Sequence, residues 1–369
     1  MRIKYIIYFL LFFSQIGFVE ILPPNQPLNG VGGKNRCVYS KIIESQYGQN
    51  DKKYYIFEPA DYTERNAPVV AFIHGWLGTN PETYRLWIDH IVKQGVIVIY
   101  PVYQRLITVA DYFTVYSSDA VKDAIQTLRT RRKHIKPDLT KFAIVGHSAG
   151  GVVAINLATI ASNDTMLPKP KFVLAVEPGR SINFETGITV IPLNDLRKID
   201  YNVNIISVAG QEDINVYDYD AKKIYNETTN VPFNMKDLVY INSDYYGDYD
   251  LIADHYAPIA LTDETLNRNK DMISRMERLS ENINVGDPNL PGFLANLSSN
   301  IKIENYLHRF DNRTGVDALD FYGFWKLTDI LIDIGFYNKN LDYLNNSDVE
   351  RYMGTWSDGK QVNHATVID

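Results

Sequence analysis

The chain has 369 residues, of which 45% are hydrophobic, and a formal net charge of −7 with both signs interspersed. This length and apolar content suit one large α/β domain, or a domain with an extension. The chain lacks the basic face or stripe of a nucleic-acid-binding protein, and its single cysteine, Cys37, excludes a disulfide-stapled scaffold.

The first twenty residues have the pattern of a secretory signal peptide. Two cations, Arg2 and Lys4, precede an apolar run from Tyr5 to about Val19. This run is short for a membrane-spanning helix, which needs about 20 apolar residues. We therefore predict a signal peptide at residues 1–20 and a secreted protein, with an uncleaved membrane anchor as the alternative. No stable membrane span is expected after signal cleavage.

Residues 21–50, which are rich in Pro, Gly and Asn at their start, are predicted to be a linker and N-terminal segment. Residues 51–260 then alternate short apolar runs with helical patterns and form the predicted core. Continuous β-branched runs separated by helices favour a mostly parallel central sheet with helices on both faces. The predicted strands are 53–59, 67–75, 95–103, 141–147, 171–179 and 202–210, and the predicted helices are 117–133 and 150–161.

The remainder of the chain is less regular in pattern. The acidic, aromatic stretch from Tyr217 to Asp254 predicts a loop or partial cap at the C-terminal edge of the sheet. Residues 261–369 are predicted to form a helical C-terminal extension packed on the core. It contains a polar helical stretch at 261–283 and an aromatic, apolar helix at 316–338. Apolar residues on nearly every side of this second helix favour docking on the core, with a lid or substrate wall as the alternative.

Ser148 lies between Gly146 and Gly150, at the point where a buried strand must become a helix. A serine hydroxyl is a poor nucleophile unless a base removes its proton. The sharp strand-to-helix turn of a G-x-S-x-G motif exposes such a hydroxyl, and small neighbours are needed because the backbone is crowded there. The motif in this context predicts a catalytic nucleophile at Ser148. The alternative is a serine in a tight turn without catalytic function.

An acyl-transfer site also needs two backbone N–H groups that stabilise the negative charge of the tetrahedral intermediate. One is expected from Ala149, the residue after the nucleophile. The other is expected from Trp76, in the stretch FIHGWLG that follows an earlier strand. For this stretch, a glycine turn with a packed histidine is the alternative.

A carboxylate is expected after a later strand, where it would orient the catalytic base and stabilise its cation. The apolar run from Ile205 turns at Gly210 and is followed by three polar residues. Asp213 is the predicted acid because its spacing from Gly210 places it one turn past the strand end. Glu212 and Asp218 are rivals, and a solvated acidic loop is the alternative.

The base is expected to be a histidine downstream of the acid, since a nucleophile on such a turn is followed by acid and then histidine. His255 is the predicted base because it lies in a loop that opens into an apolar segment. His308 lies in a polar stretch, and His364 lies near the end of the sequence, where order is least assured. The upstream histidines are expected to be structural or flanking: His74, His90, His134 and His147.

Over roughly residues 54–260 these motifs resemble those of the α/β-hydrolase superfamily. The chain is most similar to the chlorophyllase, cutinase-type and platelet-activating-factor acetylhydrolase-like esterases. These esterases combine an HG-[WF]-x-G loop, a G-H-S-x-G-G turn and a D-H-x-x-P histidine loop. The resemblance implies the α/β-hydrolase fold, with Ser148, Asp213 and His255 as nucleophile, acid and base, and the amides of Trp76 and Ala149 as oxyanion donors.

The resemblance also implies that the stretch EPGR, which follows the strand at Phe172, lies beside the substrate cleft. The chain departs from the family in its length after the histidine. Most such domains end one helix later, whereas this chain continues for more than a hundred residues. This difference bears on substrate size and access rather than on the chemistry.

The sequence therefore predicts a secreted serine hydrolase that cleaves small-molecule or lipid esters through an acyl-enzyme intermediate. No cofactor is expected. No metal is expected either, because the chain lacks an H-E-x-x-H motif, a cluster of cysteines and a calcium-loop pattern. The alternatives are a lipase or phospholipase that acts at lipid surfaces, and a non-catalytic binding protein with this fold.

Overall fold

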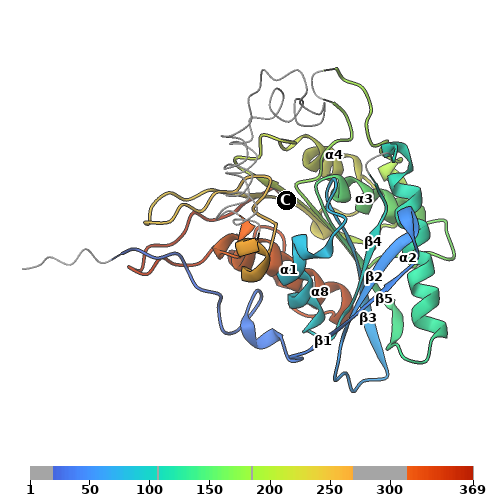
Figure 1. Ribbon diagram of the computed structural model, residues 1–369. Helices are drawn as coiled ribbons and strands as arrows, with labels where there is room; N and C mark the ends of the chain where they lie inside the picture. Colours follow the sequence, from blue (N-terminus) through green and yellow to red (C-terminus); the bar gives the residue numbers. More distant parts are fainter. Residues whose placement is uncertain (1–19, 106–107, 184–185, 269–313, 369) are drawn as a thin grey trace, which may run out of the picture.

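The computed structural model describes residues 20–105, 108–183, 186–268 and 314–368, and these form a layered α/β structure (Figure 1). Its strands make one sheet in the order β1-β2-β4-β3-β5-β6-β7-β8-β9. Neighbours from β4 through β8 pair in parallel, whereas β1, β2 and β9 add antiparallel pairings toward the edges. This arrangement confirms the predicted α/β-hydrolase fold with its mostly parallel central sheet.

Each predicted strand is present, and the central strands are almost wholly buried, which explains their continuous apolar runs. The sequence analysis did not identify the outer strands β1, β8 and β9. The strands are β1 Ile42–Tyr47, β2 Lys53–Pro59, β3 Asn66–Ile73, β4 Ile97–Val102, β5 Lys136–His147, β6 Phe172–Val176, β7 Asn204–Gly210, β8 Lys236–Ile241 and β9 Thr366–Ile368.

Helices cover both faces of the sheet, as predicted. α1 and α8 bury their apolar residues in the cluster on one face, and α2 and α3 bury theirs in the cluster on the other (Figure 1). The predicted helix 117–133 begins one turn earlier, because Phe113 is buried against Trp76 and Tyr103. The helices are α1 Arg85–Val92, α2 Phe113–Thr130, α3 Ala149–Ala161, α4 Tyr219–Glu227, α8 Trp325–Tyr337 and α9 Asp348–Arg351.

The prediction that Tyr217 to Asp254 forms a loop or partial cap is wrong. The segment contains α4, whose Ala221 and Ile224 are buried, and β8, which pairs in parallel with β7. Acidic and polar residues separate the few apolar positions of this stretch, so its composition conceals the helical and strand periodicity. Beyond Ile241 the segment is irregular up to the loop that carries the predicted base.

The predicted apolar helix at 316–338 is present as a π-helical turn, Asp320–Phe324, followed by α8. Phe336 of α8 packs against Phe172 of β6, with ring centroids 5.2 Å apart, so this helix is part of the core. Most of the polar helix predicted at 261–283 lies outside the described residues. None of the helices described here has the length and apolar character needed to cross a bilayer.

A buried polar cluster ties the N-terminal segment to helices α1 and α8. The carboxylate of Asp329 on α8 accepts hydrogen bonds from Gly32 N at 2.7 Å and from His90 Nε2 at 3.1 Å, and it pairs with Arg36 Nε at 3.1 Å. A buried charge must be compensated in this way. Burial disfavours the charged form of His90, but the charge of Asp329 and the hydrogen bonds to Asp329 and Cys37 together outweigh it and raise the pKa of His90 to about 9. The charged pair of His90 and Asp329 therefore helps to join the N-terminal segment, α1 and α8 at neutral pH.

The raised pKa makes a testable prediction about stability. Protonated His90 stabilises the native state fully below its unfolded pKa of about 6.5, and this stabilisation is lost as pH rises through about 9. We expect the destabilisation caused by His90→Gln, relative to the wild type, to shrink by up to about 3 kcal/mol between pH 6 and pH 9.5. Urea unfolding of both proteins at each pH measures this difference.

The comparison with the wild type removes contributions from groups that titrate in both proteins. Lys326 is one such group, since burial lowers its pKa to about 7. A destabilisation that stays constant from pH 6 to pH 9.5 would contradict the assignment of a charged His90–Asp329 pair.

Candidate active site

Ser148 lies at the junction of β5 and α3 in a left-handed backbone conformation, with φ 57° and ψ −126°. Residues other than glycine rarely adopt such a conformation unless the surroundings enforce it. Here the Ser148 N–H donates to Val176 O at 2.9 Å, and its carbonyl accepts from Gly151 N at 2.8 Å and Gly179 N at 3.2 Å. Both polar backbone groups are therefore fixed, and the side chain is presented at the end of the sheet.

The two glycines of the motif are required by the close approach of neighbouring backbone. A Cβ atom on Gly146 would lie 2.2 Å from the carbonyl oxygen of Gly150. A Cβ atom on Gly150 would lie 2.1 Å from the carbonyl oxygen of Ile73, at the end of β3. Backbone atoms cannot move aside as a flexible side chain can, so both positions exclude any larger residue.

The structure brings the predicted nucleophile, base and acid together in a continuous hydrogen-bonded row. His255 Nε2 lies 2.8 Å from Ser148 Oγ, and His255 Nδ1 lies 2.7 Å from Asp213 Oδ2. The other carboxylate oxygen of Asp213 accepts the N–H groups of Asn215 at 2.8 Å and Val216 at 3.1 Å. This is the order that proton transfer from a serine through an imidazole requires.

The rival residues are placed elsewhere or lie outside the described residues. Glu212 accepts a hydrogen bond from the hydroxyl of Tyr245, and Asp218, just before α4, forms an ion pair with Lys222 of that helix. His364 contacts a neighbouring side chain at the surface. His308 lies outside the described residues.

Two backbone N–H groups beside Ser148 are available for a developing oxyanion. Within the described residues, neither the N–H of Trp76 nor that of Ala149 has a hydrogen-bond acceptor. The N–H groups on either side of Trp76, those of Gly75 and Leu77, are both bonded to side chains. Trp76 and Ala149 are the residues that the sequence analysis predicted for this role.

A buried hydrogen-bonded chain connects the loop of Gly75, the motif turn and the histidine loop. The Tyr84 hydroxyl accepts from Gly75 N at 3.0 Å and lies 2.8 Å from His147 Nδ1, while His147 Nε2 lies 3.1 Å from the carbonyl oxygen of His255. Burial lowers the pKa of His147 well below its usual value, so the ring is neutral at pH 7. A neutral ring that donates from Nε2 and accepts at Nδ1 satisfies both contacts.

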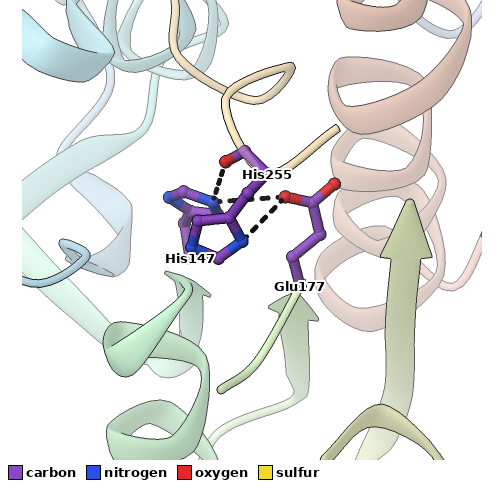
Figure 2. A group of neighbouring side chains, drawn as sticks. All are labelled: His147, Glu177 and His255. Carbon is purple, nitrogen blue, oxygen red and sulfur yellow. Dashed lines mark hydrogen bonds and ion pairs between the residues drawn. The ribbon is translucent and has the colours of Figure 1, made fainter. Parts of the chain in front are cut away.

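Glu177, directly after β6, places a second carboxyl group beside the base, as Figure 2 shows. Its Oε2 lies 3.4 Å from His147 Nε2 and 3.6 Å from His255 Nδ1. Burial raises the pKa of Glu177 well above its usual value, and the charges of Asp213 and Asp254 raise it further, so the group is protonated at neutral pH. The sequence analysis placed the stretch EPGR beside the cleft but did not select this residue.

The ligand atoms of His147, Glu177 and His255 lie within 4.8 Å of one another, close enough to hold a metal ion (Figure 2). However, His255 Nδ1 is already bonded to Asp213, and His147 Nε2 is already bonded to a carbonyl oxygen. A metal ion would have to break the contacts that hold the base. We therefore interpret this cluster as support for His255.

A cavity of about 660 Å³ opens above Ser148 and His255. This volume lies in the range of pockets that bind small organic molecules. Its wall combines apolar side chains with a few polar ones, as a pocket for an ester with an apolar portion would. The apolar side chains are those of Trp76, Leu77, Val190, Tyr256 and Ile259, and the polar ones include those of Arg180, Asn183 and Asn215.

Comparisons with known proteins support the same fold. A protein-family model described as Chlorophyllase matches residues 33–265, which is more than half of the chain. A curated relative, chlorophyllase type 0 of Chenopodium album, is 32% identical over 136 residues. This match covers 32% of the chain and 37% of the relative, so it spans little more than a third of the relative's length.

The crowding at the turn predicts the effect of a single methyl group. We expect Gly150→Ala to lower the free energy of unfolding by about 3 kcal/mol or more, because its Cβ would overlap backbone atoms. Gly323→Ala is the matched control, since the nearest atom to its Cβ is the flexible end of Ile241 at 3.4 Å. Thermal unfolding of both variants tests this, and a Gly150→Ala protein as stable as the control would contradict it.

Proposed function

Because the chain belongs to the chlorophyllase family, we propose that it is an ester hydrolase of the α/β-hydrolase type that cleaves carboxylic esters through an acyl-enzyme on Ser148. His255 is the general base, and Asp213 is the carboxylate that orients it. The observation that supports this most strongly is the hydrogen-bonded row of 2.8 Å from Ser148 Oγ to His255 and 2.7 Å from His255 to Asp213.

In the proposed reaction, Ser148 Oγ attacks the ester carbonyl carbon while His255 Nε2 accepts the hydroxyl proton. The carbonyl oxygen becomes negatively charged and accepts hydrogen bonds from the N–H groups of Trp76 and Ala149. His255 then donates its proton to the departing alcohol, which leaves the acyl group on Ser148. Water, deprotonated by His255, cleaves this acyl-enzyme and restores the serine.

Asp213 is suited to stabilise the imidazolium that forms twice in each cycle. One of its oxygens faces His255 Nδ1, and two backbone N–H groups fix the other. The carboxylate therefore keeps the ring in the tautomer that presents an unprotonated Nε2 to Ser148.

A lipase that acts at lipid surfaces is the second candidate, and exposed apolar side chains at the cavity mouth favour it. Trp76 and Leu77 line the cavity and are 44% and 49% exposed. Ile214, between Asp213 and the cavity-lining Asn215, is 70% exposed. Such a rim favours contact with the apolar part of a substrate or with a lipid layer.

Secretion is part of the proposal and is supported by the composition of residues 1–20 alone, nearly all of which lie outside the described part of the structure. An apolar run after two cations is typical of a signal peptide. An uncleaved anchor is the alternative.

The nucleophile is tested with 4-nitrophenyl esters of increasing acyl length, together with chlorophyll, which the relative's name suggests. We expect Ser148→Ala to lower kcat by about 10⁴-fold or more, because the variant cannot form the acyl-enzyme. Hydrolysis undiminished in this variant would overturn the assignment of Ser148.

Two further readouts separate the alternatives. A fluorophosphonate probe should label the wild type but not the alanine variant, whereas a non-catalytic binding protein would not react. A rate that rises abruptly above the solubility limit of the ester would favour the lipase.

The choice between the two carboxyl groups is tested by isosteric amides. We expect Asp213→Asn to lower kcat by about 10⁴-fold, because the amide would favour the wrong tautomer of His255. Glu177→Gln should change kcat by less than about tenfold, since the protonated carboxyl group is 3.6 Å from His255 Nδ1 and makes no hydrogen bond to it. The reverse order of effects would make Glu177 the orienting acid.

A further inference from the structure

Among the described residues that line the cavity, one side chain has a permanent charge. Arg180 alone of these residues is a lysine, arginine, aspartate or glutamate. Its side chain is exposed, and within the described residues its guanidinium has neither an ion pair nor a hydrogen bond. Five of the other ten arginines among the described residues, such as Arg36 and Arg85, pair with carboxylates.

The backbone fixes Arg180 next to the nucleophile. Its φ of 77° is left-handed, a conformation that a residue with a side chain adopts only under constraint. The preceding residue, Gly179, donates its N–H to the carbonyl of Ser148 at 3.2 Å, and the Arg180 carbonyl accepts from Ile191 N at 2.9 Å. The following residue, Ser181, bonds the buried carboxylate of Asp220 through its N–H at 3.0 Å and through its hydroxyl.

Strain retained in a loop that is tied on both sides points to a role for the side chain that it positions. Arg180 directly follows Gly179, whose N–H is bonded to the Ser148 carbonyl, and consecutive Cα atoms are about 3.8 Å apart. The backbone of Arg180 therefore lies close to that of Ser148. Since Arg180 and Ser148 line the same cavity, an ester bound at Ser148 lies within reach of the Arg180 side chain.

Within the described residues, neither Asp213 nor Glu177 forms an ion pair with this cation. Asp213 is bonded to His255 and to two backbone N–H groups. Glu177 is protonated, because burial and two neighbouring charges raise its pKa well above the usual value. Among the described residues the guanidinium thus has no counter-ion, and it provides an attractive position for an anion in a chain whose overall charge, −7, repels anions.

We propose that Arg180 is a specificity-determining residue, and that the preferred substrates are esters that carry a carboxylate elsewhere in the molecule. The planar guanidinium binds such a carboxylate through two parallel hydrogen bonds. This inference rests on the proposed esterase function and adds the class of substrate.

The experiment compares matched esters that differ in one charge. 4-Nitrophenyl hydrogen adipate and 4-nitrophenyl hexanoate test a carboxylate on the acyl side, and 4-carboxyphenyl hexanoate and phenyl hexanoate test the alcohol side. Adipate is chosen because its carboxylate is too distant to attack its own ester readily. The ratio of kcat/KM for the charged over the neutral ester is measured for wild type, Arg180→Gln and Arg180→Lys.

We expect Arg180→Gln to lower this ratio by about three- to tenfold in at least one arm, mainly through KM, since an exposed charge pair is worth little more. Arg180→Lys should retain part of the preference, and added salt should reduce it in the wild type. Arg129→Gln is the matched control, because it removes the same charge from an exposed position at the far end of α2. That position is about 24 Å along the helix from Phe113, which contacts Trp76.

Arg180→Gln could leave the kcat/KM ratio of charged to neutral ester unchanged in both arms while the wild type hydrolyses the neutral esters. This result would overturn the role of Arg180 and leave the esterase function intact. An equal loss in Arg129→Gln would also overturn it, because the effect would then belong to net charge. Absence of hydrolysis of every ester by the wild type would instead contradict the proposed function itself.

Discussion

The left-handed backbone of Ser148 is the constraint on which the rest of the site depends. The end of β5, the start of α3 and the end of β3 approach so closely around it that two flanking positions admit only glycine. A conformation of this kind costs about 1–3 kcal/mol and persists only where its surroundings over-determine it. Here the buried end of β5 and the buried helix α3, on either side of Ser148, hold its backbone in this conformation. The position of the hydroxyl at the wall of the cavity is thus a product of core packing.

Around the Ser148 hydroxyl, most of the buried ionisable side chains are uncharged. Burial holds His147 neutral and Glu177 protonated. The pKa of Tyr84 is also raised by burial, so its hydroxyl stays protonated. An imidazolium that forms on His255 during acyl transfer would therefore have the carboxylate of Asp213 as its hydrogen-bonded counter-ion. Because the surroundings have a low dielectric constant, the attraction between the His255 imidazolium and the Asp213 carboxylate is stronger than it would be in water.

The sequence predicted those features that sterics or burial impose on residue type. Buried parallel strands need continuous apolar runs, and the turn at Ser148 needs glycine on both sides, so both are visible in the residues themselves. Asp213 and His255 were selected from their order and spacing, and the structure places His255 against Ser148 and Asp213 against His255. Glu177 was not selected, because its position beside the base depends on a left-handed backbone and on three elements that meet only in the fold. Strand β9 was not identified either, because its three residues are too few to show a strand pattern and only their pairing with β8 defines them as a strand.

The pairing of β9 with β8 has a consequence for synthesis on the ribosome. The Asn242 side chain, just after β8, bonds the carbonyl of His364, which is 122 residues later in the chain. At about 5–20 residues per second, this partner emerges on the order of ten seconds after β8. During that interval the nascent polypeptide presents an unpaired strand edge, which can template association with other chains. Chaperones that shield this edge cotranslationally would therefore govern how much of the newly made polypeptide reaches its native state.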